Sequence, residues 1–134
     1  MRKHLLWVVT AASLVAAALW VAPTAAAPAG ATVERAVFTF NNPVRVANRI
    51  LMGSYVIEHD EGRMARGEPC TRIYKGTNIR NPTLLVAEFH CVHLDRAPVA
   101  AATATVSRAV GNGEPVWLDE FQYVGTSAGH GVPR

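Results

Sequence analysis

Short runs of β-branched and aromatic residues, separated by clusters of Gly, Pro and Asn, fill the chain from Val33 onward and constrain its fold most strongly. Such runs are typical of strands, and the clusters between them are typical of turns. The clearest turn residues are NNP at 41–43 and GNG at 111–113. This pattern predicts an all-β domain, a single antiparallel β-sandwich or small barrel of about seven short strands.

Three segments of this series bear on function. The run LLVAEFHCVHL, residues 84–94, is apolar on both faces and predicts one central strand. The run CTRIY, residues 70–74, predicts the strand that pairs with it. The segment DEGRMARGEP, residues 60–69, has no periodic apolar face, so it predicts an exposed loop and is the best candidate for a partner contact.

The N-terminal residues have the composition of an export signal. Arg2 and Lys3 precede a long apolar run that is followed by small residues. We expect a signal-peptide helix in residues 1–31, cleaved near Ala26 to Ala31, and a single domain in residues 32–134 that ends in a flexible tail. The alternative is a retained anchor, because the apolar run, at about 1.5 Å of rise per residue, approaches the thickness of a bilayer core.

The charge balance of the mature domain excludes some classes of partner. The chain has 13 Lys and Arg against 10 Asp and Glu, and the loss of Arg2 and Lys3 with the signal leaves 11 against 10. Such a balance gives no electrostatic reason to expect nucleic acid or, after cleavage, a membrane. The expected partner is a protein or small-molecule ligand, met in the periplasm or outside the cell.

The two cysteines of the chain, Cys70 and Cys91, are expected to form a disulfide, because export leads to compartments that oxidise thiols. Antiparallel pairing of their two strands supports this bond. Placing Cys70 opposite Cys91 also places Lys75 opposite Val86, and the chain then reverses within the turn sequence IRNP.

The motif EFHCVHLDR also permits a metal site. Strand alternation would place Cys91 and His93 on one face and His90 on the other. A thiolate and imidazoles are suitable ligands for Cu or Zn, the only cofactors that we consider. A site that uses His93 would draw on His90, His59 and His130, and a disulfide would remove Cys91 from the ligands.

Enzymatic activity is left open but not favoured, and no catalytic residue is assigned. His59, oriented by Asp60 or Glu58, could act as a general base. We expect these side chains to lie instead at the solvated end of a hairpin. The sequence contains no nucleophile turn and no glycine-rich phosphate loop.

The stretch FTFNNPVRVANRILMGSYVIEH resembles a loosely defined group of small exported bacterial β-proteins of uncharacterised function. The resemblance centres on Leu51, Gly53 and Tyr55, each separated from the next by one residue, and on the closing stretch LDEFQYVGTSAGHGVP. It implies a compact exported β-domain and supplies no catalytic residue. The sequence therefore predicts an exported binding or structural module stabilised by one disulfide, with a small metal-binding protein that uses His93 as the alternative.

Overall fold

A computed structural model describes residues 30–107 and 114–134 of the chain. The predicted signal peptide falls almost wholly within residues 1–29, and the predicted GNG turn falls within 108–113, so both lie outside the described residues. No helix in the described part of the chain is long and apolar enough to cross a membrane.

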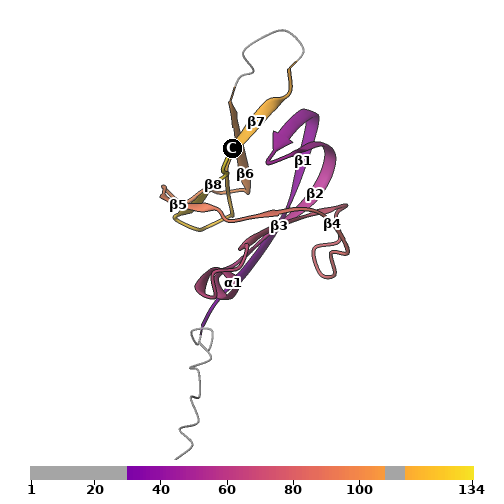
Figure 1. Ribbon diagram of the computed structural model, residues 1–134. Helices are drawn as coiled ribbons and strands as arrows, with labels where there is room; N and C mark the ends of the chain where they lie inside the picture. Colours follow the sequence, from indigo (N-terminus) through magenta and orange to yellow (C-terminus); the bar gives the residue numbers. More distant parts are fainter. Residues whose placement is uncertain (1–29, 108–113) are drawn as a thin grey trace, which may run out of the picture.

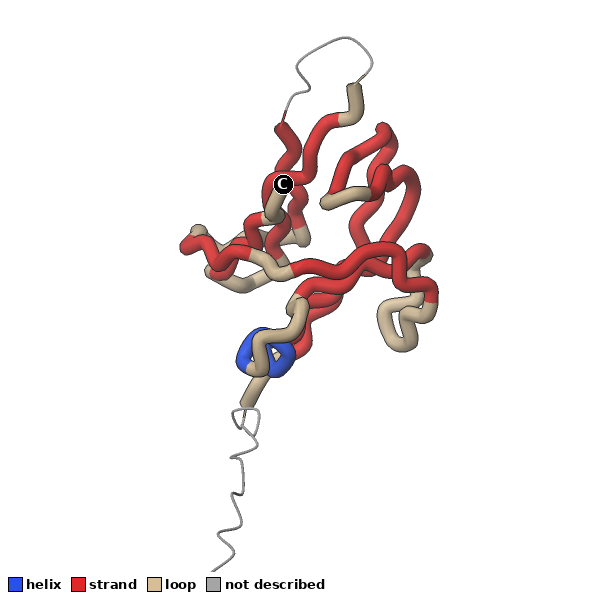
Figure 2. Tube along the Cα trace, in the orientation of Figure 1, coloured by secondary structure: helices blue, strands red, loops and turns tan. Residues whose placement is uncertain are grey.

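Strands dominate the described residues, which confirms the prediction of an all-β domain (Figure 2). The elements are, in order, β1 (Val33–Val46), β2 (Arg49–Asp60), α1 (Glu61–Ala65), β3 (Thr71–Lys75), β4 (Leu84–Phe89), β5 (Val92–Asp95), β6 (Thr103–Ser107), β7 (Val116–Gln122) and β8 (Ala128–Gly131).

All eight of these strands belong to one sheet with the order β4-β3-β2-β1-β7-β8-β5, and β6 pairs with β7 from outside this path. The sequence predicts an antiparallel sheet, but the sheet is mixed. β1 and β7 run parallel where Val44 and Arg45 pair with Val116 and Trp117. The remaining ladders between these strands are antiparallel. Figure 1 shows the sheet curling, with β3 and β4 turning across the β1–β2 hairpin.

The run at 84–94, predicted as one central strand, is two strands at opposite ends of the sheet. β4 pairs only with β3, whereas β5 pairs with β8. His90 and Cys91 alone link them, and so short a link spans at most about 11 Å. The two ends of the sheet must therefore approach each other, and Cys91 lies where they meet.

The core fills the inside of the curl with aromatic and β-branched side chains. β1 alternates between buried and more exposed residues, with Phe38, Phe40, Val44 and Val46 buried. β2 is buried on both faces from Tyr55 to His59, because β1 and β3 flank it and the curled sheet covers it. This central position places His59 inside the protein.

The hairpin of β3 and β4 is antiparallel as predicted, but its predicted register is wrong. Thr71 pairs with Phe89, and Lys75 pairs with Leu84 and not with Val86. The ladder is already one residue out of the predicted register at Thr71, and an irregularity between Ile73 and Tyr74 shifts it by one residue more.

Two segments that were predicted to be irregular are ordered. Within the predicted loop, Asp60 caps α1 by accepting a hydrogen bond from the Arg63 amide at 3.1 Å. The predicted flexible tail contains β8, which pairs with both β5 and β7 and buries His130. Gly129 leaves room beside β8 for the Glu120 side chain, whose Oε1 a Cβ at this position would overlap.

Candidate metal centre

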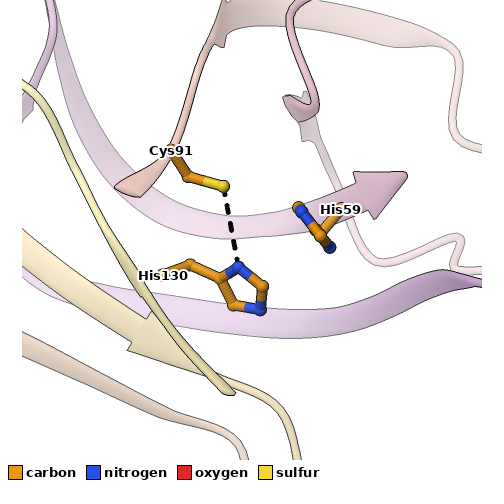
Figure 3. A group of neighbouring side chains, drawn as sticks. All are labelled: His59, Cys91 and His130. Carbon is orange, nitrogen blue, oxygen red and sulfur yellow. Dashed lines mark hydrogen bonds between the residues drawn. The ribbon is translucent and has the colours of Figure 1, made fainter. Parts of the chain in front are cut away.

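Three side chains from distant parts of the chain converge where the sheet closes (Figure 3). His59 comes from the end of β2, Cys91 from the link between β4 and β5, and His130 from β8. One potential ligand atom from each lies within 4.8 Å of the other two. Cys91 Sγ lies 3.6 Å from His130 Nδ1, and the two imidazole centroids are 4.2 Å apart.

Both imidazoles are buried with most of their nitrogens unpaired. His59 is 3% exposed and His130 is 2% exposed. Among the described residues, no hydrogen-bond partner meets Nδ1 or Nε2 of His59, or Nε2 of His130. Buried polar atoms are normally paired, because an unpaired one loses its bond to water without replacement. Three imidazole nitrogens in the cluster are therefore free to contact a bound ion or another bound group.

Glu34 lies beside both imidazoles. It pairs with His59 in the β1–β2 ladder, and its Oε2 is 3.8 Å from His59 Nδ1 and 3.8 Å from His130 Nε2. These distances exceed those of a hydrogen bond. Burial, and after it the charge of Glu61, raises the pKa of Glu34.

The buried position keeps the three converging groups uncharged near neutral pH. Burial, followed by the neighbouring imidazoles of His59 and His93, lowers the pKa of His130 to about 4. Burial also lowers the pKa of His59, although nearby carboxylates oppose that shift. Burial raises the pKa of the Cys91 thiol to about 12. Neutral imidazoles are the form that binds metal, and the thiol must lose its proton to do so.

Aromatic side chains fix the orientation of His130. Phe121 stands opposite His130 in the β7–β8 ladder and stacks on its ring at a centroid distance of 5.0 Å and an angle of 17°. Tyr123 contacts the same ring edge-on at 5.5 Å, and its hydroxyl donates a hydrogen bond of 3.0 Å to the Ile57 carbonyl. The imidazole is thus held between rigid core residues.

The two histidines of the EFHCVHLDR motif do not belong to this cluster. His93 stands opposite His130 in the β5–β8 ladder, but its side chain is 61% exposed and its Nε2 lies 3.2 Å from Asp95 Oδ1. His90 is exposed. The predicted alternation does not apply, because Cys91 lies in the link before β5 and not within a continuous strand.

Cys70 and Cys91 are neighbours, as the sequence predicts, but no bond joins them in this structure. Both are free thiols, and their Sγ atoms are 3.2 Å apart, compared with about 2.05 Å in a disulfide. The Cys91 amide donates a hydrogen bond of 3.3 Å to Cys70 Sγ.

The carboxylates beside His59 in sequence have other partners, so they do not form a base with it. Glu58 Oε2 accepts a hydrogen bond of 2.6 Å from Arg35 Nε, and its Oε1 accepts one of 2.9 Å from Arg72 Nε. Asp60 caps α1. The general-base arrangement considered from the sequence therefore gains no support from these contacts.

Sequence reasoning missed Glu34 as a neighbour of the site, and it grouped Cys91 with His93, whereas the structure groups Cys91 with His59 and His130. No local signal could have found Glu34, since only the β1–β2 register places it opposite His59. Comparison of the chain with protein-family models, with curated proteins and with solved structures finds no match.

Proposed function

We propose that the protein is an exported, barrel-like β-domain that binds one Zn²⁺ or copper ion between His59, Cys91 and His130. The observation that carries this proposal is the set of three buried, unpaired imidazole nitrogens beside a thiol, with ligand atoms within 4.8 Å of one another. A thiolate with two imidazoles suits zinc and copper, whereas calcium and magnesium require oxygen ligands.

The spacing of the ligand atoms supports this choice. With bonds of about 2.3 Å to sulfur and about 2.0 Å to nitrogen, a tetrahedral zinc ion separates these two ligands by about 3.5 Å. Cys91 Sγ and His130 Nδ1 are 3.6 Å apart. His130 Nδ1 then binds the ion, and Glu34, whose Oε2 lies 3.8 Å from His130 Nε2, is the neighbouring carboxylate.

The charges of the site also favour a cation. A divalent ion, the Cys91 thiolate and the Glu34 carboxylate sum to zero. A buried set of charges is tolerated only when they compensate one another in this way. Because the ion displaces the Cys91 proton, the apparent affinity rises with pH.

Metal analysis of purified, untagged, reduced protein tests the proposal. We expect one zinc or copper ion per chain and, on titration with Co²⁺, a sulfur-to-cobalt absorption band. His59→Ala and Cys91→Ala should each lower the affinity for Zn²⁺ by more than about 100-fold, beyond the 10- to 100-fold loss typical of outer partners.

His93→Ala is the matched control, because this histidine is exposed and outside the cluster. It should leave the affinity for Zn²⁺ unchanged, and circular dichroism should show that every variant folds. Equal losses in His93→Ala and His59→Ala, or no bound metal in the parent protein, would contradict the proposal.

A structural or binding module stabilised by a Cys70–Cys91 disulfide is the second candidate. It is favoured by the 3.2 Å separation of the two sulfurs and by the resemblance to small exported β-proteins. Mass spectrometry would support this candidate if the protein without reductant were lighter by two hydrogen atoms than the protein with reductant, and if the reduced protein bound no metal.

A further inference from the structure

The Cys91 sulfur of the site contacts two groups that can compete for it. Cys91 Sγ lies 3.6 Å from His130 Nδ1 and 3.2 Å from Cys70 Sγ. We propose that Cys70 and Cys91 are a redox pair that controls metal binding: the dithiol form holds the ion through Cys91, and the disulfide form releases it. This inference rests on the metal site proposed above.

Cys70 is the redox partner of Cys91 and not a further ligand. It does not belong to the group of described side chains whose ligand atoms all converge, which contains only His59, Cys91 and His130. Its side chain is 1% exposed, and its sulfur accepts a hydrogen bond from the Cys91 amide at 3.3 Å. Cys70 Sγ therefore lies outside the set of converging ligand atoms but in contact with one of them, Cys91 Sγ.

The difference in exposure sets the order of the steps. Cys91 is partly exposed and Cys70 is buried, so an oxidant from solution meets Cys91 first. With a small-molecule disulfide as oxidant, the Cys91 thiolate attacks one sulfur and forms a mixed disulfide, and the other sulfur leaves as a thiol after taking a proton.

Cys70 then resolves the mixed disulfide. Its thiol loses a proton, and its sulfur attacks Cys91 Sγ; the Cys70–Cys91 bond forms, the mixed disulfide breaks, and the second half of the oxidant leaves as a thiol. Two protein sulfurs lose two electrons in total, and one small-molecule disulfide becomes two thiols. A disulfide sulfur is a poor ligand, so the ion keeps only His59 and His130 and dissociates.

The backbone allows the required movement. Closing the sulfur pair from 3.2 Å to about 2.05 Å needs a shift of about 1.2 Å. Cys91 lies in the link between β4 and β5, outside the strand ladders, whereas the Cys70 carbonyl accepts a hydrogen bond of 2.9 Å from Asp60. Cys91 is therefore the residue that moves, and its sulfur becomes bonded to Cys70 in place of the ion.

The test uses the full chain, reduced, loaded with Zn²⁺ and then treated with oxidised glutathione. A chromogenic chelator measures released zinc, and mass spectrometry follows the disulfide. We expect one zinc ion to be released for each Cys70–Cys91 disulfide formed, and a reductant to restore binding.

Cys70→Ser is the decisive variant, because a hydroxyl can accept the same amide hydrogen bond. This variant should bind Zn²⁺ as the parent protein does. It should keep the ion at an oxidant concentration that empties the parent site. At higher oxidant concentrations it should accumulate only the mixed disulfide. Cys70→Ala serves the same purpose if the serine variant fails to fold.

The outcomes separate this inference from the proposed function. A reduced parent protein that binds no zinc overturns the metal site and the release step with it. A parent protein that binds zinc but keeps it after the disulfide has formed, or a Cys70→Ser variant that releases zinc as readily as the parent, overturns the redox control alone.

Discussion

The imidazole rings of His59 and His130 lie with their centroids 4.2 Å apart, although β1 and β7 separate their strands in the order of the sheet. Neighbouring strands lie about 4.8 Å apart, so three steps across a flat sheet would separate these residues by about 14 Å. Only the inward curl of the sheet brings the two rings together. The candidate metal centre is therefore a product of the curvature of the sheet.

The metal-free, reduced protein should lose stability as the pH falls from about 6.5 to about 4. The pKa of His130 is about 4 in the folded protein and 6.5 as its ordinary value, so over this range the unfolded chain binds a proton that the folded chain does not. At pH 5 the loss from this group is on the order of 2 kcal/mol relative to pH 7. His59 acts in the same direction.

Urea denaturation of the metal-free protein at pH 7 and pH 5 measures this effect. His130→Asn removes the titrating group and should reduce the difference between the two pH values, whereas His90→Asn, at an exposed position, should preserve it. An equally large pH dependence in His130→Asn would show that other groups cause it.

Glu34→Gln should weaken Zn²⁺ binding by about 10-fold or more, because it removes the carboxylate beside both imidazoles and leaves the bound cation with one compensating charge fewer. Glu114→Gln is the matched control, since Glu114 is an exposed carboxylate that does not act on the pKa of Glu34, His59 or His130. Competition with a zinc chelator of known affinity measures both variants, and similar affinities in the two would remove Glu34 from the site.

Arg72→Ala should lower the free energy of unfolding by about 1–3 kcal/mol, because it leaves the buried Glu58 carboxylate with Arg35 as its remaining cation. The Arg66–Glu68 pair is the control, because both of its side chains are exposed and such pairs contribute little. Urea denaturation should therefore distinguish Arg72→Ala clearly from Arg66→Ala.

Gly129→Ala should destabilise the protein by about 1–3 kcal/mol, as overpacking of a filled site does. The new methyl group would meet Glu120 Oε1 and displace it from its hydrogen bond of 2.8 Å with Arg96 Nε. Gly131→Ala should cost less, because its nearest contacts are at 3.4 Å. Thermal denaturation compares the two, and equal costs would argue against the tight pairing of β8.

The strands could be predicted from the sequence because their signals are local. Alternating apolar residues lie close together in the chain, and the run around Phe38 and Phe40 shows them. The turn predicted at residues 41–43 is wrong, because β1 continues through these residues with only an irregularity in its pairing. The helix α1 escaped prediction because five residues are too few to show a helical period.

The candidate site could be predicted only in part, because its geometry depends on strand order and on one break in a strand. His59, Cys91 and His130 were all recognised as possible ligands or partners. They converge because the sheet curls until its two end strands, β4 and β5, approach each other. No local pattern in the sequence encodes this curl. His93 was favoured because the break at Cys91 could not be seen.

The two-residue link between β4 and β5 also affects the order in which the protein can fold. The link lies at the junction of the first and last parts of the sheet, so its neighbours His59 and His130 meet only after the long-range pairing of β1 with β7 and of β5 with β8 is complete. Contacts of such high sequence separation form slowly. A metal ion held there would bind the folded state alone and lower the population of partly open forms by mass action.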